Sequence, residues 1–166
     1  MLKGKAWKFG DDISTDHIAP GRLFHLRSNL PEFAKHVLED ADVNFAKNVQ
    51  QGDFVVAGNN FGLGSSREHA PQIIKLSGVS AVIAKSFARI FYRNAVNIGL
   101  LLLECNTDGI EAQDELDVDI EKGIIYNKTK NTEIEFKPIS EVMTKLQKDG
   151  GLINHIKKYG DFKLTD

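Results

Sequence analysis

Three short apolar runs, separated by segments with helical periodicity, place the strongest constraint on how this chain can fold. The runs are Phe54–Ala57, Val79–Ala84 and Leu100–Leu103. Each is almost entirely apolar, which is typical of a strand buried on both faces of a sheet. Alternating strands and helices of this kind favour parallel strands with helices packed against them. The centre of the chain is therefore predicted to be α/β.

Two helices are expected between these runs. The first contains Ile73, Ile74 and Leu76 and closes at Gly78, since glycine is the usual residue just beyond a helix end. Ser86 can cap the second helix, and Gly99 ends it. The predicted apolar face of the second helix comprises Phe87, Ile90, Phe91, Ala95 and Ile98.

The flanking segments differ from this centre. A strand Leu2–Phe9 is expected to lead into a polar loop, Gly10–Gly21, and an irregular stretch, Arg22–Asn29. A helix is predicted over Pro31–Glu39, with Asn29 or Leu30 in the cap region.

After the centre, three short strands form an antiparallel meander, and two amphipathic helices separated by Gly150–Gly151 close the chain. The predicted strands are Leu116–Ile120, Ile124–Tyr126 and Thr132–Phe136, and the predicted helices are Ser140–Lys148 and Leu152–Tyr159. A length of 166 residues fits a single domain spanning 1–166.

Charge and composition narrow the possible functions. A formal charge of -2, without blocks of like charge, argues against nucleic-acid binding. The longest apolar run, Ile98–Leu103, is far shorter than the ~20 residues that span a bilayer, so we expect a cytoplasmic protein that binds no membrane. The single cysteine, Cys105, cannot supply a cysteine-based metal or iron–sulfur site and is expected to be a small buried hydrophobe. No metal site is therefore predicted in this chain.

The segment Gly62–Glu68 has the composition of an anion-binding corner. Its glycines allow close backbone approach, and the N–H groups of the helix that follows have no internal partners. Arg67 adds a cation whose shape matches a carboxylate. The same residues also fit a simple capping box, in which Ser65 would pair with Glu68. A dinucleotide fingerprint fails because Arg67 stands where the third glycine belongs, and the Walker loop and hydrolase elbow are absent.

Three segments together carry a family resemblance: Gly10–Ile18, Asn60–Ala70 and Ala84–Asn94. In this order they resemble the swivel domain of the aconitase superfamily. In length the chain is similar to the separate small subunits of 3-isopropylmalate dehydratases. The resemblance implies a mixed sheet or partly open barrel flanked by helices, with the antiparallel meander at its C-terminal end. It also implies a large partner subunit that carries a 4Fe-4S cluster, with no cofactor in this chain.

The resemblance also implies residue roles. Ser65 would be the catalytic base that removes a proton next to a substrate carboxylate, and Ser66 and Arg67 would bind that substrate. Thr15, Asp16 and His17 would lie near the site, with Asp16 orienting Ser65 or Arg67. His69, early in a helix, is expected to be a structural hydrogen-bonding residue.

In the family, the stretch Gly21–Asn29 corresponds to a loop that distinguishes substrates. Arg27 could bind a further carboxylate, which would favour a tricarboxylate such as homoaconitate. Leu23, Phe24 and Leu26 could instead pack an isopropyl group. The function that the resemblance implies is isomerisation of 2-isopropylmalate to 3-isopropylmalate in leucine biosynthesis, with a homoaconitase or a dimethylmalate- or citramalate-type dehydratase as alternatives.

Two hypotheses from other functional classes remain open. The corner could hold a carboxylate metabolite without reacting, as a non-catalytic binding module, or Ser65 could serve a hydrolase together with His17 or His69. The surface meant for a partner could also let the isolated chain self-associate.

Overall fold

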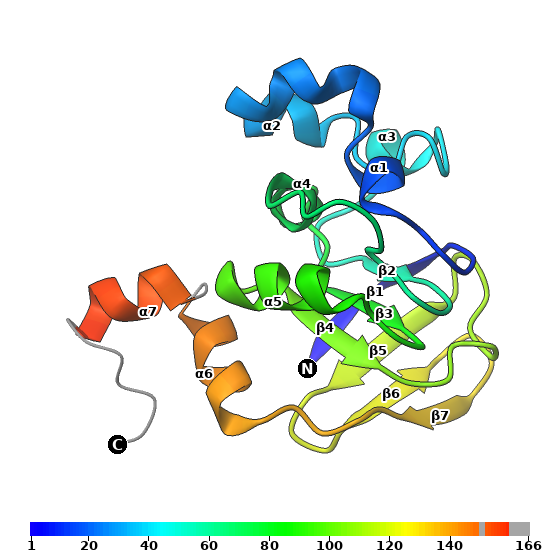
Figure 1. The fold of residues 1–166 in the computed structure, drawn as a ribbon. Helices are drawn as coiled ribbons and strands as arrows, with labels where there is room; N and C mark the ends of the chain where they lie inside the picture. The colour runs from blue at the N-terminus through cyan, green and yellow to red at the C-terminus, as the bar shows by residue number, and fades with distance from the viewer. Residues whose placement is uncertain (150–151, 160–166) are drawn as a thin grey trace.

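The computed structural model describes residues 1–149 and 152–159, and within them the strands form one seven-stranded mixed sheet (Figure 1). Its order is β4-β3-β2-β1-β5-β6-β7. The strands are β1 Leu2–Lys8, β2 Phe54–Val56, β3 Ala81–Ala84, β4 Leu101–Glu104, β5 Glu115–Asp119, β6 Ile124–Asn127 and β7 Thr132–Glu135. β1 to β4 run parallel, and β5 to β7 form the antiparallel meander. The predicted α/β class is confirmed.

Helices join and cover these strands. They are α1 Thr15–Ile18, the 3-10 helix η1 Gly21–Ser28, α2 Leu30–Ala34, α3 Phe45–Asn48, α4 His69–Leu76, α5 Arg89–Asn97, α6 Glu141–Lys148 and α7 Leu152–Tyr159. α4 connects β2 to β3, and α5 connects β3 to β4. The two connections are the predicted strand–helix–strand units, and they put the loop after β2 at the carboxyl end of the parallel strands.

The sheet curls toward a barrel. Just beyond β7, the backbone N–H of Lys137 donates to the carbonyl of Glu104 at the end of β4, at 2.9 Å. The two outer strands of the sheet therefore approach each other there, as a partly open barrel requires.

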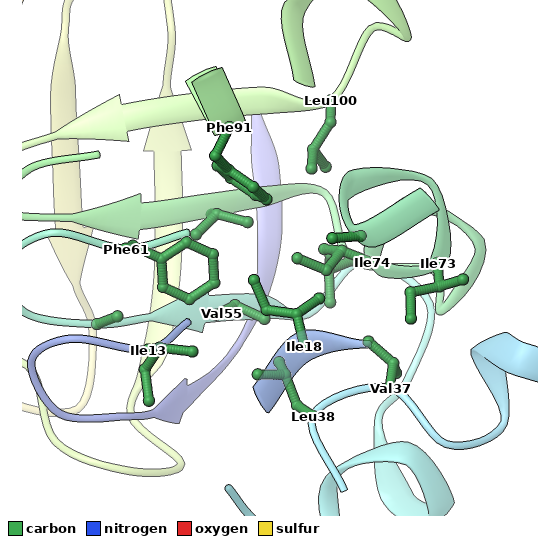
Figure 2. Packing of buried hydrophobic residues seen from close by; sticks show 14 of the residues in the cluster. Ile13, Ile18, Val37, Leu38, Val55, Phe61, Ile73, Ile74, Phe91 and Leu100 are labelled. Carbon is green, nitrogen blue, oxygen red and sulfur yellow. The ribbon is translucent and has the colours of Figure 1, made fainter. Parts of the chain in front are cut away.

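Two apolar clusters occupy the two faces of the parallel strands. Val55 and Val82 face the helices, where they join Ile18, Leu38, Ile73 and Phe91 (Figure 2). Their sequence neighbours point the other way, into the curl of the sheet, where the second cluster includes Phe54, Val56, Ile83, Leu103, Leu116 and Ile125. Burial on both faces explains why these strands are apolar without interruption.

Several predicted elements differ from the structure in the first fifty residues. The predicted loop Gly10–Gly21 contains the one-turn helix α1, and the stretch predicted as irregular is the 3-10 helix η1. α3 was not predicted. The helix predicted over Pro31–Glu39 ends at Ala34, and turns follow. Its predicted end is wrong because buried Leu38 has φ of 56° and donates its N–H to the carbonyl of Ile18.

The helix expected after Ser86 also differs in detail. α5 begins after Ala88, and no side chain caps it. The Ser86 hydroxyl instead accepts the backbone N–H of Asn60 at 2.7 Å. Ile90, which the periodicity placed on the buried face, is 43% exposed. Its exposure matters because Ile90 lies beside the candidate site.

The C-terminal helices α6 and α7 match their predicted ranges closely. The glycine pair Gly150–Gly151, predicted to separate them, lies outside the described residues. None of the helices in residues 1–149 and 152–159 is long and apolar enough to cross a membrane.

A buried carboxylate fastens β1 to the start of β2. Asp53 is 5% exposed. Its oxygens accept the backbone N–H of Lys5 at 3.0 Å, the indole N–H of Trp7 at 3.0 Å and the backbone N–H of Gln50 at 2.9 Å. These bonds fix the centre of the sheet, where the parallel and antiparallel halves meet.

We predict that Asp53→Ala lowers the free energy of unfolding by about 2–4 kcal/mol, because three donors lose a charged acceptor in a buried place. Urea denaturation measures the change. Glu121→Ala, at an exposed position, is the control and should shift stability by less than about 0.5 kcal/mol. Equal effects of the two substitutions would contradict the structural role of Asp53.

Candidate active site at the Ser65–Arg67 corner

The three motifs singled out in the sequence lie side by side and are hydrogen-bonded to one another. The backbone N–H of Gly62 donates to the carbonyl of Ile13 at 2.7 Å, and that of Thr15 donates to the carbonyl of Leu63 at 2.8 Å. On the other side, Phe61 exchanges backbone hydrogen bonds with the segment Ser86–Ala88 at 3.0 and 2.9 Å. The segment with the two serines is thus held between the other two motifs.

Gly62 is required where α5 crosses this loop. Its φ is 88°, and a Cβ atom there would lie 2.2 Å from the Cγ atom of Phe91. Any other residue would combine backbone strain with a clash against a buried ring. The approach of the loop to α5 therefore depends on this glycine.

Ser65 is fixed by its backbone rather than by its side chain. Its carbonyl accepts the hydroxyl of Thr15 at 2.9 Å and the backbone N–H of Arg67 at 2.8 Å. The Ser65 hydroxyl makes no hydrogen bond within the part of the chain that the structure describes, and Ser65 and Ser66 are both exposed. Both serines therefore present hydroxyls to whatever enters the site.

The capping-box alternative does not hold. α4 begins at His69, its N-cap is Glu68, and no side chain caps it. Ser65 and Ser66 precede the helix, and Pro71 lies in its first turn, as expected. The serines are therefore not used to start the helix.

Arg67 is held by one of its terminal nitrogens. Nη1 donates to Oδ1 of Asp16 at 2.9 Å and to the carbonyl of Ala19 at 2.7 Å. Asp16 is largely exposed, so the ion pair adds little stability, but it orients the guanidinium. Within residues 1–149 and 152–159, Nη2 and Nε have no hydrogen-bond partner, so these two donors remain for an anion.

Two hollows open on opposite sides of the corner, and Ser65, Ser66 and Arg67 line both. One, of about 290 Å³, lies against α5. Its other lining residues are Thr15, Gly62, Gly64, Ala88, Arg89, Ile90, Phe91 and Asn94. The second, of about 610 Å³, is more open and lies against η1; its other lining residues are Gly21, Phe24, Glu68 and His69. The corner is a ridge between them.

Not every residue proposed from the sequence reaches these hollows. His17 turns back to Ser14, whose backbone N–H and hydroxyl lie 3.0 and 2.9 Å from its Nδ1. Leu23 and Leu26 pack against the helix-side core. Arg27 lies over the ring of Phe24, with its guanidinium carbon 4.3 Å from the centroid. Of these loop residues, Phe24 lines the larger hollow.

Metal ligands are not gathered near the corner. Among the described residues, no three His, Cys, Asp or Glu side chains are placed to hold a metal ion. Cys105 lies in a separate hollow with Glu104 and Lys137. Burial raises the pKa of its thiol to about 11, so the group is an uncharged thiol at neutral pH. It is a poor metal ligand and a poor nucleophile.

Residues 26–108 match the aconitase C-terminal domain family. A relative from Archaeoglobus fulgidus, named 3-isopropylmalate dehydratase small subunit 2, is 65% identical over 98% of this chain and 99% of its own length. The chain belongs to the aconitase C-terminal domain family. Another member, the 3-isopropylmalate dehydratase small subunit 1 of Thermotoga maritima, is 59% identical over 98% of both chains.

A solved structure agrees with this membership. The crystal structure of a 3-isopropylmalate dehydratase from Methanocaldococcus jannaschii superposes with a TM-score of 0.91 at 47% identity, over 96% of this chain and 95% of that one. The aconitase-like fold expected from the three motifs is confirmed.

The environment of His69 differs from the one that the sequence predicted. Its Nε2 is buried without a hydrogen-bond partner in the described chain, so the expected structural hydrogen bond is absent at that atom. Its ring contacts the rings of Phe24 and Phe33. Burial lowers the pKa of His69, and the charges of Arg67 and Arg27 lower it further, against a smaller opposite effect of Glu68.

The depressed pKa of His69 gives a pH prediction. As the pH falls below about 6.5, the unfolded chain takes up a proton that folded His69 resists, so this residue reduces stability in acid. When the pH is lowered from ~8 to ~5, the free energy of unfolding of His69→Phe minus that of the parent chain should therefore increase. Urea titrations at both pH values measure this, with exposed His25→Phe as the control. A difference that does not change with pH would contradict it.

Proposed function

We propose that this chain is the small subunit of a 3-isopropylmalate dehydratase, a hydro-lyase that isomerises 2-isopropylmalate to 3-isopropylmalate in leucine biosynthesis. The observation that carries the proposal is the 65% identity, over nearly the full length of both chains, to a relative of that name. Homoaconitase and dimethylmalate- or citramalate-type activities, considered from the loop Gly21–Asn29, are not favoured by these relatives.

The corner is suited to one half of this reaction. Dehydration takes a proton from the carbon next to a carboxylate and a hydroxyl from the neighbouring carbon. We propose that the oxygen of Ser65 accepts this proton, because its hydroxyl is exposed and makes no hydrogen bond to the rest of the described chain. Nη2 and Nε of Arg67 would hold the neighbouring carboxylate, because Asp16 and Ala19 already occupy Nη1. Ser66 would add a hydroxyl to the same carboxylate.

Ser65 needs help to act as a base, because a free serine hydroxyl is too weakly acidic. A positive charge beside it would stabilise the alkoxide, and exclusion of water would strengthen that attraction. Arg67 supplies the charge, whereas the exposure of Ser65 means that water must be excluded by another surface. We therefore propose that the large subunit covers the corner and completes the site.

The hydroxyl half of the reaction needs an acid that this chain does not provide. A 4Fe-4S cluster, as the family resemblance implies, would supply Lewis acidity, but one half-buried cysteine cannot hold it. We propose that the cluster belongs to the large subunit. A cytoplasmic location remains the expectation from the sequence.

We predict that Ser65→Ala lowers kcat by about 10²–10⁴-fold in the anaerobically reconstituted two-subunit enzyme, because the proton acceptor is lost. KM and subunit association should change little. Ser80→Ala, at the opposite end of the parallel strands, is the matched control.

The same assay decides among the alternatives. It should turn over 3-isopropylmalate in preference to homoaconitate, citrate or dimethylmalate. Unchanged turnover in Ser65→Ala would refute the catalytic assignment. Tight binding of a carboxylate by the isolated chain, with no turnover in the complex, would favour the non-catalytic binding module.

We also predict that Arg67→Lys raises KM for 3-isopropylmalate by about 10–100-fold, because an ammonium cannot keep both the contact to Asp16 and a two-point contact to the substrate. Steady-state kinetics of the complex measure this. Lys3→Arg, on an exposed side chain of β1, is the control. An unchanged KM would remove Arg67 from substrate binding.

A further inference from the structure

His69 has an unusual environment for the first residue of a helix. It follows Arg67 by two positions in the chain, and its Nε2 is buried without a hydrogen-bond partner among the described residues. An unpaired buried nitrogen destabilises a fold. The contribution of this side chain must therefore come from its ring.

The ring of His69 lies in a row of four side chains, Phe33, His69, Phe24 and Arg27, which we call the aromatic column. The centroid of the His69 ring is 5.4 Å from that of Phe33 and 5.6 Å from that of Phe24. The guanidinium carbon of Arg27 lies over the ring of Phe24, 4.3 Å from its centroid. Phe33 is fully buried whereas Phe24 is 42% exposed, so the column runs from the core to the surface.

The column gives Phe24 its position. η1, which carries Phe24 and Arg27, has no fully buried residue and a non-helical kink at Leu23. Leu23 and Leu26 are only partly buried. Phe24 lines the larger hollow together with Ser65, Ser66 and Arg67, and His69 reaches the same hollow. Contact with the His69 ring therefore fixes one wall of the hollow relative to the serines.

We propose that His69 is a positioning residue whose ring holds Phe24 as the wall of the larger hollow that faces Ser65, and that it thereby sets which hydroxy acid the site accepts. The specificity part rests on the proposed function, because it assumes that the substrate occupies this hollow. A flat ring at position 69 suffices for the role, and its nitrogens are not needed.

Kinetics of the reconstituted complex test the specificity role. In His69→Ala, KM for 3-isopropylmalate should rise about fivefold to tenfold with kcat within about twofold, because the aromatic support of Phe24 is lost. The preference in kcat/KM for 3-isopropylmalate over dimethylmalate should fall as well. His69→Phe should restore both values to within about twofold of the parent. His36→Ala, a matched change at a residue that lines neither hollow, should behave like the parent.

A second measurement does not depend on activity. In the full chain labelled with fluorophenylalanine, the ¹⁹F signal of Phe24, identified by Phe24→Leu, should move toward its solvent-exposed value in His69→Ala. It should stay shifted in His69→Phe and in His36→Ala. Ring currents from residue 69 are the physical cause of the shift.

The outcomes separate the two proposals. If His69→Ala leaves the Phe24 signal unchanged, the aromatic column does not hold Phe24. If the His69→Phe enzyme is as impaired as the His69→Ala enzyme, a nitrogen is required at position 69 and the positioning role is overturned. Inactivity of the parent complex toward every hydroxy acid overturns the proposed function and the specificity role with it, while the ¹⁹F result still decides how Phe24 is held.

Discussion

The loop after β2 is clamped on both edges by backbone hydrogen bonds to segments that are distant in sequence. Gly62 and Leu63 pair with the segment Ile13–Thr15 at the start of α1, and Phe61 pairs with the segment that precedes α5. These bonds fix the backbone of a glycine-rich loop at the carboxyl end of the parallel strands. The exposed serines can hold a defined geometry because the backbone beneath them is fixed.

The clamp in turn depends on a close approach that side chains would prevent. Phe91 of α5 fills the space beside Gly62, and Thr15 lies beside Gly64, where a Cβ would be 3.2 Å from its hydroxyl oxygen. The loop therefore lies directly against α5 on one side and α1 on the other. The loop after β2 thus contacts α1 and α5 at the end of the parallel strands, and the candidate site lies at this contact.

The corner is open in the isolated chain, and this agrees with its proposed role as half of an active site. Arg67 offers two unused donors, and the serines are exposed on a ridge between two hollows. Exposed apolar side chains flank it, Phe24 on one side and Ile90 on the other. A partner that closes over this ridge would bury those side chains and exclude water, which the proposed base requires.

Local pattern determined the central strands, because burial on both faces leaves an uninterrupted apolar run. It also determined the meander and the terminal helices, because burial of one face leaves a period in the sequence. The three motifs also marked the residues of the corner. The early end of α2 at Ala34, the exposure of Ile90 and the unpaired nitrogen of His69 left no such mark. Each is decided by residues far away in the chain: Ile18 bonds Leu38, the Gly62 loop covers the side of α5 next to Ile90, and Phe33 and Phe24 enclose His69. The sequence alone thus specified which residues form the corner, and the tertiary structure decided which of them face the hollows, because only long-range packing fixes the direction of a side chain.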